Sequence, residues 1–196
     1  MDDINGIISQ EEKEDVQKRI YTLKNEENNS ELKAFLLSCI EKYPDEYYFY
    51  TELSACCYGL DQPAESLKYA EKAIELKGKD DDVWVNFHYG MALTLNDKYD
   101  EAIAQFDKIL RKRISTIAYN EHGEGMKFAK GIVMDAKYMK GRSLMETGNY
   151  AKAKKLIKEH LAMRQRGTYT SFYKHDAEMY LKKLEKLLKT NTKNEQ

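Results

Sequence analysis

Apolar residues recur along this chain at the spacing of amphipathic helices, and short polar segments separate the helical stretches. Val16, Ile20 and Leu23, for example, lie three or four residues apart and share one face of a helix. Polar segments at 26–29, 96–98 and 147–149 interrupt the stripes and predict turns. No strand-like alternation is sustained, so the expected fold class is all-α. The pattern predicts helices over 11–24, 30–42, 47–58, 63–76, 83–95, 99–113, 126–147, 150–164 and 172–189.

Part of this pattern returns in one frame. The clearest copies are Gly90-x2-Leu93-x5-Tyr99-x2-Ala102-x3-Phe106 and Gly141-x2-Leu144-x5-Tyr150-x2-Ala153-x3-Ile157, with a fainter one at Ser54-x2-Cys57-x5-Pro63-x2-Ser66-x3-Ala70. The copies begin 36 and then 51 residues apart. A period near 34 residues is typical of helix–turn–helix arrays, in which no hairpin buries its apolar face alone. The small residues mark where the two antiparallel helices of a hairpin approach closely.

The repeated pattern resembles the tetratricopeptide repeat (TPR). This resemblance implies one domain over 1–196, coiled into a right-handed superhelix of about four antiparallel hairpins with a C-terminal capping helix. The expected parts are a divergent N-terminal hairpin over 11–44, repeats over 45–80, 81–113 and 125–166, and a capping helix over 172–189. The final helix has a Lys- and Glu-rich outer face, as the end of such an array requires.

The interval of 51 residues leaves an inserted segment, which we expect to form an extended hairpin over 114–130. The spacing of Ile109, Ile114 and Ile117 predicts that the preceding helix continues beyond its usual end. Phe128 and Ile132 predict that the following helix begins early. Residues 120–125 would then form the loop at the tip of a protruding hairpin.

In TPR proteins, side chains beside the packing stripe of each first helix face the partner. The register places at such positions Tyr48, Thr51, Ala55 and Tyr58, then Trp84, Phe87, His88, Met91 and Thr94, then Asp135, Tyr138, Met139, Arg142 and Met145. Thr51, Ala55 and Phe87 stand where members that clamp a terminal carboxylate carry Lys, Asn or Arg. An aromatic and Met-rich groove instead favours a partner helix or an apolar peptide. Trp84 has a second interpretation as a displaced core residue, because Asn86 stands where the family prefers an aromatic.

Charge and hydropathy exclude several classes of function. The chain carries 32 basic and 33 acidic residues, giving a net charge of −1, which argues against general nucleic-acid binding. Lysine-rich stretches at 152–158 and 182–189 are interrupted by apolar residues at helical spacing, which favours solvated helix faces. The N-terminus has no signal-peptide pattern, and no apolar run is long enough for a membrane span. We expect a cytoplasmic protein, and the Lys-, Tyr- and Asn-rich composition suggests a bacterial source.

No residue pattern predicts catalysis, a metal site or a cofactor. The histidines at 88, 122, 160 and 175 lack metal-ligand spacing, and His160 is expected to be a satisfied interior histidine. Cys39, Cys56 and Cys57 form no CxxC and are expected to be buried thiols. Gly123-Glu124-Gly125 lacks the glycine pattern that cradles phosphate.

We therefore expect a non-enzymatic module that binds another protein or peptide in its groove. Two alternatives remain open. One is an immunity- or inhibitor-type protein that occludes a toxin or an enzyme. The other is a self-associating module whose groove is filled by a second copy, which makes a homo-oligomer, or by its own C-terminal helix.

Overall fold

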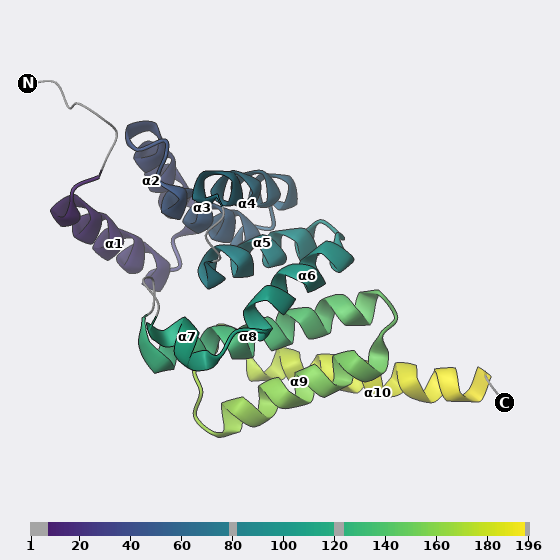
Figure 1. Cartoon of the computed structure of the whole chain (residues 1–196). Helices are drawn as coiled ribbons and strands as arrows, with labels where there is room; N and C mark the ends of the chain where they lie inside the picture. The colour runs from purple at the N-terminus through teal and green to yellow at the C-terminus, as the bar shows by residue number, and fades with distance from the viewer. Residues whose placement is uncertain (1–7, 79–81, 120–123, 195–196) are drawn as a thin grey trace, which may run out of the picture. The chain divides into compact units, whose positions relative to one another are not determined.

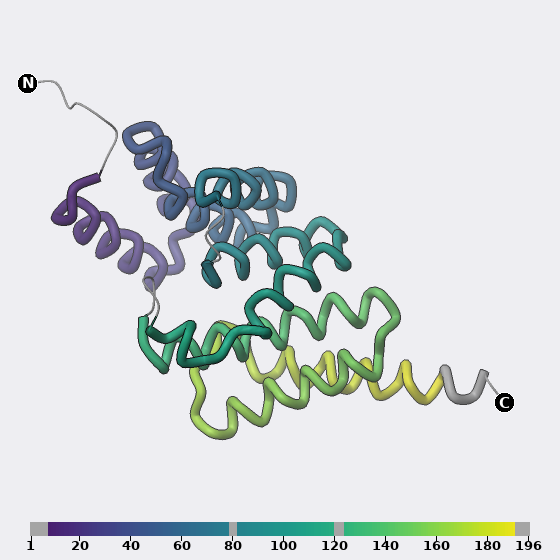
Figure 2. The backbone as a smooth tube through the Cα atoms, viewed as in Figure 1, coloured from purple at the N-terminus to yellow at the C-terminus, as the bar shows by residue number. Residues whose placement is uncertain are grey.

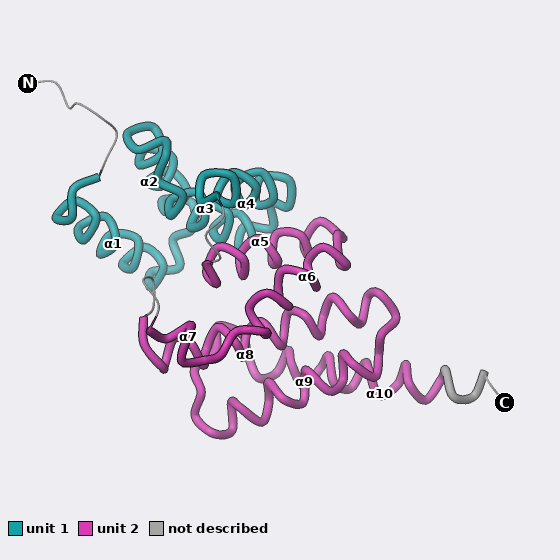
Figure 3. The backbone as a smooth tube through the Cα atoms, viewed as in Figure 1, with its two compact units in different colours: residues 1–80 teal, residues 81–196 magenta. Residues whose placement is uncertain are grey.

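The computed structural model describes residues 8–78, 82–119 and 124–194. Within these ranges every regular element is a helix and no strand is present, which confirms the all-α fold class (Figure 1). The chain divides into two compact units, residues 1–80 and 81–196, at the boundary predicted between two repeats (Figure 3). The single domain and the right-handed superhelix stay predictions, and each unit is described by itself.

In unit 1, residues 8–78 form four helices that pack in chain order (Figure 2). They are α1 (Gln10–Asn25), α2 (Asn29–Lys42), α3 (Tyr47–Gly59) and α4 (Pro63–Lys77). Leu23, Leu36, Leu53 and Cys57 are completely buried in its core. The expected helix boundaries agree closely with these, and Asn28 caps α2 by accepting a bond from the Glu31 N–H.

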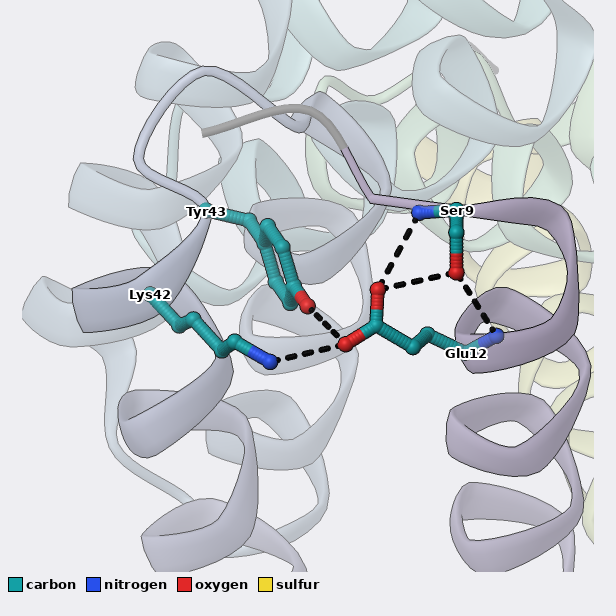
Figure 4. A network of polar contacts seen from close by, with 4 residues as sticks. All are labelled: Ser9, Glu12, Lys42 and Tyr43. Carbon is teal, nitrogen blue, oxygen red and sulfur yellow. Dashed lines mark hydrogen bonds and ion pairs between the residues drawn. The ribbon is translucent and has the colours of Figure 1, made fainter. Parts of the chain in front are cut away.

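The start of α1 is fixed to the end of α2 by one carboxylate (Figure 4). Ser9 and Glu12 form a capping box, in which each side chain accepts a bond from the other residue's backbone N–H. Glu12 also accepts bonds from Lys42 Nζ at 2.8 Å and Tyr43 Oη at 2.9 Å. These bonds, the one from Lys42 above all, lower the pKa of Glu12 to about 2.

Unit 2 contains two hairpins, a short inserted helix and a final helix. They are α5 (Val83–Leu95), α6 (Tyr99–Leu110), α7 (Ile114–Tyr119), α8 (Gly125–Glu146), α9 (Tyr150–Gln165) and α10 (Lys174–Asn194). The hairpins are α5–α6 and α8–α9; α6 and α7 pack against α8, and α10 packs against α9. Figure 1 shows α10 lying alongside α9.

All four hairpins close with the same turn. A residue with positive φ follows the first helix: Glu27, Asp61, Asp97 or Gly148. The N–H of the next residue then donates to a carbonyl five positions earlier, on Leu23, Cys57, Leu93 or Leu144. This left-handed cap satisfies carbonyls at the helix end, and three of the four positions adopt it without glycine. The backbone therefore repeats even in the divergent first hairpin.

The small residues of the repeated pattern lie at close helix contacts, as predicted. A Cβ on Gly90 would lie 2.7 Å from the Phe106 ring, and a Cβ on Gly141 would lie 2.9 Å from Ile157 Cδ1. In the α3–α4 hairpin, Ser54 Oγ donates to the Ser66 carbonyl at 2.9 Å and Ser66 Oγ donates to the Ser54 carbonyl at 3.0 Å. Each buried hydroxyl thus donates to a backbone carbonyl of the facing helix. Glycine and alanine occupy the same two positions in the hairpins of unit 2.

The inserted segment differs from the prediction. Helix α6 ends at Leu110 instead of continuing, and residues 111–113 turn the chain into α7. Ile117 and Ala118 of α7 are buried, and α7 packs against α8. A continued α6 would not have brought these residues onto α8, so burying their apolar surface favours the break. The early start of α8 is confirmed; the predicted loop tip at residues 120–123 lies outside the described residues.

The contact at Gly141 predicts that Gly141→Leu destabilises the protein by about 1–3 kcal/mol, because the added side chain must displace Ile157 and α9. Ala151→Leu on the exposed face of α9 is the matched control and should change stability little. Urea unfolding followed by circular dichroism measures both. Equal stability of the two variants would show that the helices do not touch at Gly141.

Candidate protein-interaction surface

The groove positions of α5 are buried within the protein rather than offered to a partner. Phe87 is 4% exposed, and its ring lies 6.1 Å from the ring of Phe106 on α6. Met91 and His88 are also buried, as is Thr94, whose hydroxyl pairs with Ser143 of α8 at 3.0 Å. The sequence predicts that these four side chains face a partner. In the structure they belong to the core instead, because α5 is apolar on nearly every side.

Trp84 packs within unit 2 while remaining half-buried. Its ring lies 4.3 Å from His88 and 5.9 Å from Phe128. Phe128 belongs to the early turns of α8 that the insertion supplies. These contacts favour the second interpretation of Trp84, a displaced core residue, since its indole packs against side chains of its own unit.

Tyr138, predicted to anchor a partner, is instead covered by the C-terminal part of the chain. It is 2% exposed. Its ring lies 5.0 Å from His160 on α9, 4.6 Å from Phe172 and 6.0 Å from Tyr180 on α10. A helical register shows which side chains share a stripe but not which later segment covers that stripe. The prediction that Tyr138 faces a partner is therefore wrong in this arrangement.

The remaining groove positions of α8 are either buried or in contact with the C-terminal part of the chain. Met139 and Met145 are buried, and Asp135 is bonded to the segment that precedes α10. Arg142 is half-buried with its guanidinium 5.2 Å from the centre of the Tyr180 ring and 5.9 Å from that of Tyr138. Such cation–π contacts fasten α10 to α8. Arg142 thus binds this chain's own helix.

In unit 1, α3 carries the other predicted groove residues. Thr51 is buried and its hydroxyl donates to the Tyr47 carbonyl one turn earlier at 3.0 Å. Tyr48, Ala55 and Tyr58 are half-buried.

A buried carboxylate holds the segment between α9 and α10 in place. Asp135 is 4% exposed and accepts bonds from the hydroxyl of Thr170 and from the Ser171 N–H, the latter at 3.0 Å. Burial raises the pKa of Asp135, while the bonds from Thr170 and Ser171 oppose that rise. The carboxylate therefore positions Phe172 against Tyr138.

His160 is buried, as predicted, but only one of its two ring nitrogens is hydrogen-bonded among the described residues. It is fully buried, and its Nδ1 donates to the Met134 carbonyl at 3.1 Å. In the described part of the chain its Nε2 has no hydrogen-bond partner. Burial lowers the pKa of His160 below the ordinary value of 6.5, so the neutral imidazole is the folded form.

The three cysteines are buried free thiols, which confirms the prediction from their spacing. Burial raises the pKa of each thiol, that of Cys57 to about 11. Raised pKa values disfavour the nucleophilic thiolate. Among residues 8–78, 82–119 and 124–194, no group of three or more His, Cys, Asp or Glu residues is placed to hold a metal ion. Within the same ranges, none of the helices combines the length and apolarity that a membrane crossing needs.

The outer surface of α9 and α10 is accessible, and the sequence pattern there predicts only solvated helix faces. Five of its exposed lysines, here called the lysine face, are Lys152, Lys155 and Lys158 of α9 and Lys182 and Lys186 of α10. Lys174 and Lys183 of α10 are also exposed, but they pair with Glu178 and Glu146. An ion pair of 3.2 Å between Lys154 and Glu185 joins the two helices. An open hollow of ≈ 510 Å³ lies along α9, lined by Ala151, Lys154, Lys155, Lys158, Glu159 and Ala162.

The signal that could have found this surface is the local charge. Residues 150–194 contain twelve lysines and arginines against four aspartates and glutamates, whereas residues 1–80 contain ten against eighteen. The near-neutral total hides this division.

Comparison with known proteins supports the fold. No family model matches the chain, and no curated protein matches it in sequence. Among solved structures, it is similar to one described as "MamA RS-1 ArsTM double mutant", with a TM-score of 0.53 and 10% identity. The match covers 90% of this chain and 94% of that chain. This likeness indicates a TPR-like fold and an all-helical repeat architecture.

The covering of Tyr138 predicts that Tyr138→Ala acts on stability. Loss of a fully packed aromatic ring should cost about 3–5 kcal/mol in urea unfolding. Tyr173→Ala, at a side chain that is mostly exposed, is the control and should stay near wild type. Equal unfolding free energies for the two variants would mean that the C-terminal segment does not cover Tyr138.

The buried imidazole predicts a pH-dependent stability component. Because the folded-state pKa of His160 is lowered, its contribution is present above pH 6.5 and is lost as pH falls toward the folded pKa. The unfolding free energy of His160→Gln should therefore fall less than that of wild type between neutral and mildly acidic pH. His175→Gln, on the exposed face of α10, should retain the wild-type slope. Parallel pH profiles for wild type and His160→Gln would contradict a buried neutral imidazole.

Proposed function

We propose that this protein is a non-enzymatic interaction module that binds another protein. A TPR-like fold supports this, since stacked hairpins offer long surfaces for partners. The observation that carries the proposal is the division of side chains in unit 2. Aromatic and methionine side chains at the groove positions pack inside the unit, while the lysines of α9 and α10 remain exposed.

We further propose that the partner contacts the outer surface of unit 2 rather than the predicted groove. Phe87, Met91 and Tyr138 would have to leave the core to reach a partner, which costs the hydrophobic free energy of their burial. Side chains of α9 and α10 need no such rearrangement. Binding through preformed surfaces is the general case for rigid interaction domains.

Site-specific photo-crosslinking in the source cells tests both statements. A photoreactive residue at Lys152 of α9 should capture a discrete protein, whereas the same residue at Glu71 on the exposed face of α4 is the matched control. Absence of any captured protein at both positions would contradict an interaction module. Capture at Glu71 alone would keep the module and move its surface to unit 1.

A further inference from the structure

We infer that the lysine face binds an acidic segment of the partner protein. Carboxylates of that segment would pair with Lys155 and Lys158, and a small apolar side chain would lie in the hollow between Ala151 and Ala162. This inference rests on the proposed function and adds the chemistry of the partner to it.

The excess of positive charge in unit 2 lies in its last two helices, α9 and α10. Residues 81–149 contain ten basic and ten acidic residues, so the excess of unit 2 arises after residue 149. The nearby carboxylates are already paired: Glu159 with Lys137 of α8 at 2.6 Å and Glu185 with Lys154 at 3.2 Å. In the described part of the chain, no carboxylate lies within ion-pair distance of the five lysines of the lysine face. The face therefore presents uncompensated ammonium groups.

This arrangement works against the stability of the free protein. Lys155 lies three residues from both Lys152 and Lys158, and Lys186 lies four residues after Lys182. Like charges at these helical spacings are neighbours and repel each other. An anionic partner removes that repulsion and gains charge-assisted hydrogen bonds from the same groups.

The surface suits an acidic peptide better than a polyphosphate or a membrane. Nucleic acid needs a continuous positive track, but the carboxylates of Glu159 and Glu185 interrupt this one. A membrane-binding helix needs an exposed apolar face, whereas Ala177 and Leu184 of α10 are buried. The alanines of the hollow offer a short apolar contact, which a polypeptide can fill between two carboxylates.

The test measures fluorescence anisotropy of a labelled synthetic peptide bearing glutamates three and four residues apart and one leucine. Lys155→Gln with Lys158→Gln should weaken its binding by at least about fivefold, since each exposed ion pair contributes modestly. Added salt should weaken wild-type binding as well. The matched control is Lys127→Gln with Lys130→Gln, two exposed lysines at the same spacing on α8, which should bind as wild type does. Equal binding by both double variants would overturn the inference.

The hollow has its own test. Ala162→Gln places a longer polar side chain at the hollow without changing charge, so the leucine peptide should lose its advantage over a version with serine in place of leucine. If wild type shows no preference for the leucine peptide, the hollow is not part of the site and the inference as stated is wrong.

Three further probes separate the alternative occupants. One contrary outcome is that the protein binds a DNA duplex, or vesicles containing phosphatidylserine, more tightly than the acidic peptide. If the double variant Lys155→Gln/Lys158→Gln also lost that binding, the occupant would be nucleic acid or a membrane, and the inference of an acidic protein segment would be overturned. Salt-sensitive dimerisation in sedimentation, lost in the same variant, would make a second copy the occupant. If the peptide test fails but a partner is still crosslinked, this inference alone is overturned. If no partner is crosslinked, the proposed function is overturned.

Discussion

The close contact between the paired helices of each hairpin is the constraint on which the rest of the structure depends. In unit 2, Gly90 lets the Phe106 ring approach α5, and Gly141 lets Ile157 approach α8. A side chain at Gly90 would separate α5 from α6, and one at Gly141 would separate α8 from α9, on which α10 packs. In the α3–α4 hairpin, the reciprocal Ser54 and Ser66 bonds achieve the same approach with polar atoms. The first hairpin has the larger Ile20 and Leu32 at the corresponding positions, and α1 and α2 approach each other less closely.

That contact also decides where the aromatic side chains go. With α8 and α9 held together, Tyr138 and His160 lie side by side, and the segment before α10 places Phe172 against them. Asp135 fixes that segment through Thr170 and Ser171, and Arg142 spans the rings of Tyr138 and Tyr180. Side chains that a longer array would offer to a partner therefore complete the core of the last hairpin. Helix α10 and the segment before it make Tyr138 inaccessible.

Sequence periodicity predicted the hairpins well because it reports contacts within about one repeat. The spacing of Gly141, Leu144 and Ile157 is set by two adjacent helices, and the turn at Gly148 follows from a short polar segment. The break after Leu110 and the covering of Tyr138 depend on segments further along the chain, α7 on α8 and α10 on α9. The apolar stripes of α6 and α8 do not specify which of these later segments packs against them. The candidate surface was missed for a different reason: summing charge over the whole chain conceals a local excess.

A cap at the end of a repeat array must present a polar outer face, or the exposed end would bind another array. Mixed charges would meet that requirement at least cost, since pairs of opposite sign at helical spacing are favourable. The α9–α10 surface instead repeats one sign at Lys152, Lys155 and Lys158, while its carboxylates Glu159 and Glu185 pair with lysines outside the lysine face. Capping explains why the surface is polar but not why it is positive. The excess of positive charge after residue 149 is the observation on which the proposal of an anionic partner rests.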